Sequence, residues 1–124
     1  MRIFTTKWFT KWAAKEGLTD EALRTAVAEM EQGLIDASLG GHVYKKRVGV
    51  QGRGKRGGVR TLLAFKADDK AFFIYGFAKS QRDNIGNQEL QALKRLAAEI
   101  LAYSDQALNK ALKAGELREV ENDG

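Results

Sequence analysis

The sequence predicts an α+β fold, in which an N-terminal helical hairpin and a C-terminal helix pack on a small, largely antiparallel sheet. Two strand-like segments, 59–65 and 71–77, follow one another, and apolar residues at helical spacing lie before and after them, over 6–33 and from residue 87. Strands that are grouped together are typical of α+β proteins. The length is usual for one domain, so residues 1–124 are expected to form a single domain.

A short edge strand is expected at residues 2–5, followed by the two helices of the hairpin. Thr5 or Thr6 can cap the first helix and Gly17 can end it, while Thr19 can cap the second. Each helix has an apolar face that is expected in the core. The residues on these faces are Trp8, Phe9, Trp12, Ala13, Leu23, Val27, Met30 and Leu34.

The middle of the chain is expected to form strands. The segment HVYKKRVGV at 42–50 is strand-like, and 59–65 and 71–77 are joined by a short turn, which predicts a β-hairpin. In the second strand of this hairpin both alternating sets of residues are apolar, so it is expected at the centre of the sheet. The two sets are Phe73, Tyr75 and Phe77 on one side and Phe72 and Ile74 on the other.

Two more helices are expected toward the C-terminus. Asn87 can cap the first, which carries a broad apolar stripe and is the clearest helix in the sequence. Ser104 or Asp105 can begin the second, which runs to Gly115, and residues 117–124 can add a short strand. The stripe consists of Leu90, Leu93, Leu96, Ala97, Ile100 and Leu101.

The composition excludes several classes of protein. The chain has no cysteine and one histidine, His42, which excludes disulfides, cysteine-ligated zinc and mechanisms that need two imidazoles. No apolar run approaches the roughly 18 to 20 residues that span a bilayer, so no membrane association is expected. The N-terminal residues do not resemble a secretory signal. We therefore expect a cytoplasmic protein.

Positive charge is concentrated in the middle of the chain. Residues 37–67 contain eight Lys or Arg and no Asp or Glu, whereas the whole chain has a net charge of +5. Such segregation favours a surface that binds a polyanion, because each cation brought to a phosphate releases condensed counterions. A solvated loop kept soluble by its charges is the alternative. The eight are Lys45, Lys46, Arg47, Arg53, Lys55, Arg56, Arg60 and Lys66.

Known cofactor motifs do not fit this segment. Residues 52–57 match G-x-G-x-x-G, but a dinucleotide site needs a helix after these glycines, and here a strand follows. A nucleotide P-loop needs Ser or Thr after Gly-Lys, whereas Arg56 follows Lys55. Metal catalysis needs clustered carboxylates, which the basic segment lacks. We therefore expect no cofactor and no metal.

A second cationic segment, 79–82, follows the last strand of the predicted hairpin. In an antiparallel pair the start of one strand lies beside the end of the other, so Arg60 and Lys79 are expected to be neighbours. Two cations at this spacing form a site that suits a phosphate.

Together these segments resemble one known family. GGHVYKKRV, GRGKRGGVRTLLAF and FFIYGFAKSQRDNI, followed by a Glu- and Leu-containing helix, are similar to the RelE/HigB superfamily of toxins from toxin–antitoxin systems, in particular to a RelE subgroup with GK-x-GG-x-R and FF-x-YGFAK motifs. The resemblance implies a RelE-like fold and an endoribonuclease that cuts mRNA on the ribosome. It also implies a cognate antitoxin, commonly with a helix-turn-helix domain.

The resemblance also implies roles for individual residues. Arg60 matches the arginine that contacts the scissile phosphate, and Lys55 and Lys79 join it as catalytic candidates. Some relatives have an arginine directly after the position of Lys79 and a tyrosine later in that segment. This chain has Ser80 at the first position and residues 85–86 near the second, so proton-transfer roles do not carry over there. The RNA-binding candidates are Lys45, Lys46, Arg47, Arg53, Arg56 and Arg82.

RNA cleavage without a metal proceeds by attack of a ribose 2′-OH on the adjacent phosphate. A cationic site stabilises the growing phosphate charge, and a lysine crowded by other cations loses its proton more easily, so Lys55 or Lys46 can act as the base. His42 is a further acid–base candidate, but a histidine at the start of a strand is more often structural or simply exposed. Two alternatives remain: a ParE-like toxin that inhibits gyrase without nuclease activity, and a basic nucleic-acid-binding module that does not cut.

Overall fold

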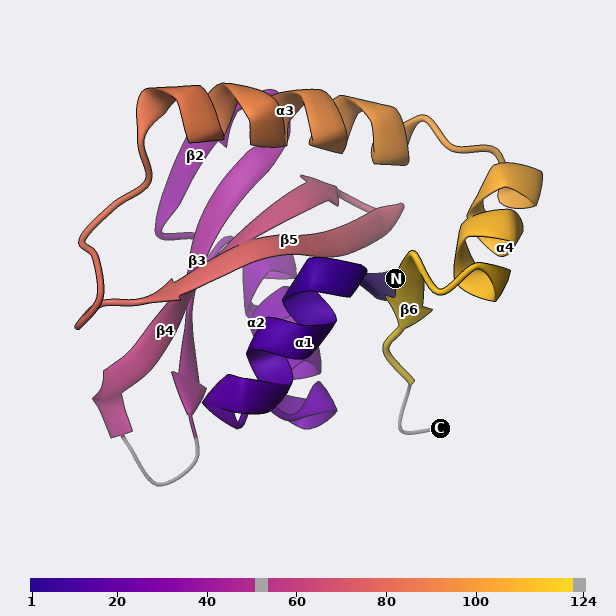
Figure 1. The fold of residues 1–124 in the computed structure, drawn as a ribbon. Coiled ribbons are helices and arrows are strands. Elements are labelled where there is room, and N and C mark those ends of the chain that lie inside the picture. The colour runs from indigo at the N-terminus through magenta and orange to yellow at the C-terminus, as the bar shows by residue number, and fades with distance from the viewer. Residues whose placement is uncertain (51–53, 122–124) are drawn as a thin grey trace.

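The computed structural model describes residues 1–50 and 54–121, with the backbone alone at residues 54–57. Within these residues the strands form one sheet in the order β2-β3-β4-β5-β1-β6 (Figure 1). Neighbouring strands are antiparallel except β1 and β5, which are parallel. The elements are β1 (Arg2–Thr6), α1 (Lys7–Glu16), α2 (Asp20–Glu31), β2 (Ala37–Gly40), β3 (Val43–Val50), β4 (Gly54–Lys66), β5 (Lys70–Ala78), α3 (Asn87–Leu101), α4 (Asp105–Lys113) and β6 (Leu117–Glu119).

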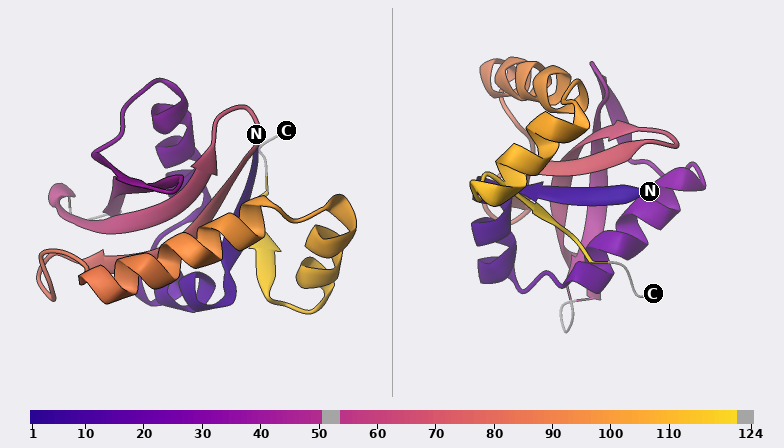
Figure 2. Two further views of the ribbon diagram at one scale, coloured as in Figure 1. Left: turned by 90° about the horizontal axis from the view of Figure 1, so that it is seen from above. Right: turned by 90° about the vertical axis from the view of Figure 1, so that its right-hand side faces the viewer.

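Helices cover both faces of this sheet (Figure 2). On one face α1 and α2 bury residues such as Phe9 and Val27 against Leu63 and Phe73 of the sheet. On the other face α3 and α4 bury a separate hydrophobic cluster, to which Ile100 belongs. The predicted α+β fold, with the N-terminal helices and a C-terminal helix packed on a largely antiparallel sheet, is confirmed.

The predicted starts of three helices are confirmed by their side-chain caps. Thr6 Oγ1 accepts a hydrogen bond from the Phe9 N–H at 3.2 Å, and Thr19 and Ser104 make the equivalent bonds at 3.1 Å. Asn87 was expected to cap α3, and this expectation was wrong. Gly86 occupies the cap position instead, and the Glu89 carboxylate accepts a hydrogen bond from its N–H at 3.2 Å.

Other expectations about the edges of the fold were wrong. Trp8 and Leu34 are 47% and 58% exposed, so neither lies in the core. Leu34 falls beyond the end of α2 at Glu31, where helical spacing no longer applies. β1 is not an edge strand, because β6 pairs with its outer side, and β2 was not expected at all.

A β-bulge in β5 changes which side chains face α3. Leu62 pairs with Tyr75 and Leu63 pairs with Phe73, so Ile74 has no partner on β4. Ile74 and Tyr75 consequently both pack with the α3 cluster, although they are adjacent in the chain. Tyr75 and Phe73, which strict alternation places on one side, lie on opposite faces of the sheet.

Candidate functional site

Three side chains form a row across the centre of the sheet. Arg60 on β4 lies opposite Arg47 on β3 and opposite Phe77 on β5. Residues directly opposite each other in antiparallel strands point to the same face, so this row has two cations beside an aromatic ring. We call Arg47, Arg60 and Phe77 the arginine row.

The arginine row lies on the α3 face of the sheet. Two residues further along each strand, Lys45, Leu62 and Tyr75 form the next row, and Leu62 and Tyr75 pack with the α3 cluster. The hairpin of β3 and β4 extends away from α3 (Figure 1). Arg47 is exposed and Arg60 half-buried, and neither forms an ion pair with any residue that the structure describes.

Lys79 directly follows β5. Its neighbour Ala78 pairs with Val59, which precedes Arg60 in β4. Lys79 is exposed, and within the described part of the chain no carboxylate pairs with it. The register thus brings Lys79 and Arg60 to neighbouring positions of the hairpin. Lys79 therefore adds a third cation beside the arginine row.

Lys46 points to the opposite face. It pairs with Thr61, and its Nζ lies 3.0 Å from a carboxylate oxygen of Glu29 on α2. Its side chain is 9% exposed. Lys46 is therefore separated by the sheet from Arg47 and Arg60. The alternation of Lys46 with Tyr44, Val48 and Val50 was the sequence signal that could have placed it on the apolar side.

Arg82 is held by contacts with its own loop, with α3 and with β5. Its guanidinium donates to Glu89 at 2.7 and 3.1 Å, to the Asn84 carbonyl at 2.8 Å and to the Tyr75 hydroxyl at 3.4 Å. It also lies over the Phe77 ring, with Cζ 5.9 Å from the centroid. Arg82, and after it the Gly86 N–H, hold the pKa of the Glu89 carboxyl below its usual range. These contacts fix the segment between β5 and α3 beside the arginine row.

The remaining candidates lie elsewhere. Arg53 and the side chains of Lys55 and Arg56 are outside the described residues. His42 is exposed in the turn before β3, with a positive φ of 62°. It lies five positions before Arg47, which corresponds to about 17 Å in an extended strand. The register therefore places His42 at the other end of β3 from Arg47 and its partner Arg60.

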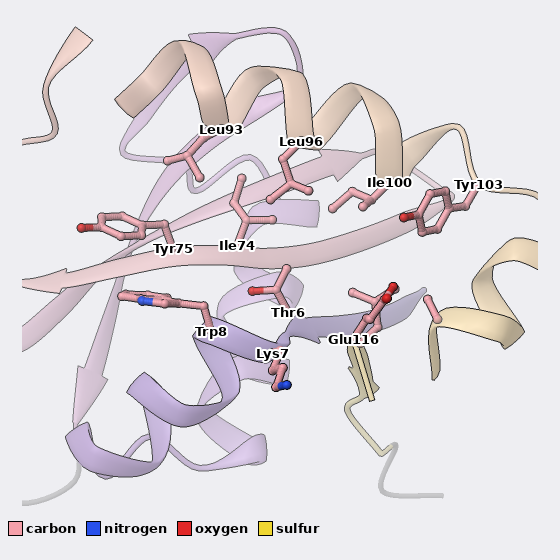
Figure 3. Close-up of a pocket in the computed structure, with 12 residues that line it drawn as sticks. Thr6, Lys7, Trp8, Ile74, Tyr75, Leu93, Leu96, Ile100, Tyr103 and Glu116 are labelled. Carbon is pink, nitrogen blue, oxygen red and sulfur yellow. The ribbon is translucent and has the colours of Figure 1, made fainter. Parts of the chain in front are cut away.

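The α3 face also has a groove that the sequence did not indicate (Figure 3). It has a volume of about 420 Å³ and lies between α3, β5 and the junction of β1 with α1. Trp8 stacks on Tyr75 with ring centroids 4.6 Å apart. We call this the apolar groove, because its walls include Trp8, Ile74, Tyr75, Leu93, Leu96 and Ile100.

Among the described residues, no three His, Cys, Asp or Glu side chains are grouped so that they could hold a metal ion. In the same part of the chain, no helix has the length and apolar character needed to cross a bilayer.

Fold and charge together define a small α+β protein with a basic strand face. The chain belongs to the RelE toxin family, because the family model described as the RelE toxin of the RelE/RelB toxin–antitoxin system matches residues 1–120. No curated protein matches the chain. The protein is thus the toxin of a toxin–antitoxin pair, and its family implies a cognate antitoxin as partner.

Proposed function

We propose that this toxin is a cytoplasmic, ribosome-dependent endoribonuclease that cleaves mRNA without a metal. The observation that carries the proposal is the arginine row, in which Arg47 and Arg60 face each other and neither guanidinium forms an ion pair with a described carboxylate. The nearby Asp36 carboxylate accepts a hydrogen bond from the backbone N–H of Arg47 instead. Two like charges held side by side are unfavourable for folding. A phosphate between them would remove this repulsion.

In the proposed reaction a ribose 2′-OH loses its proton to a base and attacks the adjacent phosphate. The P–O5′ bond breaks, and the 5′ oxygen leaves as a hydroxyl after taking a proton from water, so that the products are a 2′,3′-cyclic phosphate and a 5′-OH end. Arg60 donates two parallel hydrogen bonds to the charge that grows on the phosphate oxygens, and Arg47 and Lys79 add positive charge around it. Lys55 is proposed as the base, because the alternative, Lys46, lies on the other face in its pair with Glu29. The ribosome would hold the mRNA in a reactive geometry, which alone can supply several kcal/mol.

The test is cleavage of mRNA on purified ribosomes by Arg60→Ala. Losing one preorganised donor to the transition state lowers the rate by about a hundredfold to a thousandfold. Arg60→Lys should recover little, since an ammonium cannot reproduce the two parallel hydrogen bonds. Arg95→Ala is the control, because Arg95 is exposed on α3 and its loss changes the net charge by the same amount.

Three results would contradict the proposal. A folded Arg60→Ala protein that cuts mRNA at the wild-type rate would show that Arg60 is not part of the active site. A wild-type protein that leaves mRNA intact on ribosomes but inhibits gyrase would be a ParE-like toxin. Salt-sensitive RNA binding with no cut ends would indicate a binding module.

A further inference from the structure

The peptide group that joins Lys46 to Arg47 is held at both ends by side chains. Its carbonyl, which belongs to Lys46, accepts a hydrogen bond from Thr61 Oγ1 at 2.8 Å. Its N–H, which belongs to Arg47, donates to the Asp36 carboxylate. Thr61 is fully buried on β4, whereas Asp36 is exposed just before β2. The plane of the peptide group that leads into Arg47 is thus fixed from both sides of β3.

Asp36 takes the place of a neighbouring strand at this point of β3. β2 begins at Ala37, which pairs with Lys45, so β3 continues beyond β2 toward its hairpin with β4 (Figure 1). The Asp36 N–H donates to the Lys45 carbonyl at 3.1 Å, and the Asp36 carboxylate accepts the next outward-facing N–H of β3, that of Arg47. Without this carboxylate the Arg47 N–H would face solvent at the edge of the sheet.

The direction of the Arg47 N–H determines how closely the two arginines approach. The Lys46 carbonyl points to β4, where Thr61 lies, and the Arg47 N–H points the other way, to Asp36. Arg47 therefore exchanges no backbone hydrogen bond with Arg60, although the two residues lie directly opposite each other. Such a non-hydrogen-bonded pair is the closer kind in an antiparallel ladder, with Cα atoms about 4.5 Å apart.

Repulsion within this close pair acts to separate the two strands. Like charges at opposed positions destabilise the pairing, and β3 has no further strand beside it at Arg47. Asp36 opposes the separation, because it holds the backbone of Arg47 and brings a negative charge near the pair. Among the described residues its carboxylate forms no ion pair with either guanidinium, so Arg47 and Arg60 stay free for a phosphate.

We propose that Asp36 is a positioning residue for the arginine row, and that it acts through Arg47 without touching RNA. It fixes the backbone of Arg47 so that the guanidinium stays beside that of Arg60. A carboxylate repels a phosphate, and this one already accepts a backbone N–H, so direct contact with the substrate is not its role. The effect on cleavage rests on the proposed endoribonuclease function, whereas the contact with the backbone does not.

Hydrogen exchange of backbone amides in the full-length toxin tests the contact. Asp36→Ala should speed exchange of the Arg47 amide by about tenfold or more, because the amide loses its acceptor. The Lys46 amide points to β4 and should change by less than about threefold. Asp36→Asn should keep the slow exchange, since its side-chain oxygen can accept the same hydrogen bond. Equal exchange at Arg47 in the wild type and in Asp36→Ala would overturn the proposal.

A double-mutant cycle on cleavage of mRNA on ribosomes tests the positioning role. Asp36→Ala should lower the cleavage rate by about tenfold to a hundredfold, as small displacements of an oriented group do. In the Arg47→Thr background the same change should alter the rate by less than about threefold, because no guanidinium is left to position. A merely structural role would lower the rate in both backgrounds, and equal losses would therefore overturn the proposal.

Two further variants complete the test. Glu31→Ala is the matched control, because Glu31 is an exposed carboxylate at the end of α2, and it should alter neither exchange at Arg47 nor cleavage. Asp36→Asn should cut at close to the wild-type rate. An Asp36→Asn protein that keeps slow exchange but does not cut would overturn the positioning role and would assign the carboxylate to the reaction itself. If the wild type does not cut mRNA, the proposed function fails, while exchange at Arg47 still decides for or against the contact.

Discussion

Arg47 and Arg60 lie directly opposite each other on β3 and β4. Like charges at opposed positions destabilise a sheet, so this pair lowers the stability of the free toxin. A loss of stability of this kind is expected at a site whose residues bind a ligand, because such residues do not serve to stabilise the fold.

Replacement of Arg47 by Thr should therefore stabilise the free protein. We expect the free energy of unfolding to rise by about 0.2–1 kcal/mol, because the repulsion with Arg60 disappears. Lys45→Thr is the control, since Lys45 lies opposite Leu62 and has no cation across the strand. Urea unfolding compares the two variants, and a less stable Arg47→Thr protein would show that the pair is not repulsive. Cleavage of mRNA by Arg47→Thr should fall despite the gain in stability.

The pair of Lys46 and Glu29 gives a second prediction. Lys46→Met should leave mRNA cleavage unchanged and should not lower the stability, because an apolar side chain suits this buried position. Glu29→Met should lower the free energy of unfolding by about 1–3 kcal/mol, because it leaves a buried ammonium without its partner. Thermal melts and ribosome assays measure both effects. A Lys46→Met protein that folds but does not cut mRNA would show that Lys46 takes part in the RNA site.

Gly76 is predicted to tolerate no side chain. A Cβ at this position would lie 2.2 Å from Trp12 Cζ3, so the Trp12 ring must move. Gly76→Ala should destabilise the protein by about 1–3 kcal/mol, as overpacked cores do. Gly49→Ala is the control, because a Cβ there meets no atom within 4 Å. Gly49→Ala should raise the stability by about 0.5–1 kcal/mol, since glycine is unfavourable inside a strand. Similar melting temperatures for the two variants would contradict this prediction.

The ion pair of Asp20 and Arg118 predicts a dependence of stability on pH. Arg118 donates to the Asp20 carboxylate at 2.7 and 3.1 Å and holds the pKa of this carboxyl below its usual range. A pKa lowered in the folded state contributes stability above the unfolded pKa of about 3.9, and the contribution is lost as the pH falls through the folded pKa.

A double-mutant cycle with Asp20→Asn and Arg118→Gln measures this contribution. The coupling free energy should be about 0.2–1 kcal/mol at pH 7, because both side chains are partly exposed. It should decrease below about pH 4 and vanish in stronger acid. A coupling that is constant between pH 7 and pH 2 would contradict the assignment.

Local patterns were sufficient to predict most elements of this protein. Thr6, Thr19 and Ser104 begin their helices as predicted, since a cap is a contact within three residues of the chain. The hairpin of β4 and β5 follows from two apolar runs around a short turn. The concentration of positive charge is also a property of the sequence.

Which side chains share a face was decided by the tertiary structure. Pairing with β4 leaves Ile74 unpaired, and this bulge moves Tyr75 and Phe77 to the face of Arg60, whereas alternation groups them with Phe73. Alternation along β3 places Lys46 and Arg47 on opposite faces, but their partners, Glu29 and Arg60, come from other elements and were decided by the tertiary structure. Side chains alternate between the two faces of a strand, and this period of two can be read from the sequence. Register and bulges depend on the partner strand, which can be distant in the chain. Register and the bulge at Ile74 determined which residues form the arginine row and the apolar groove.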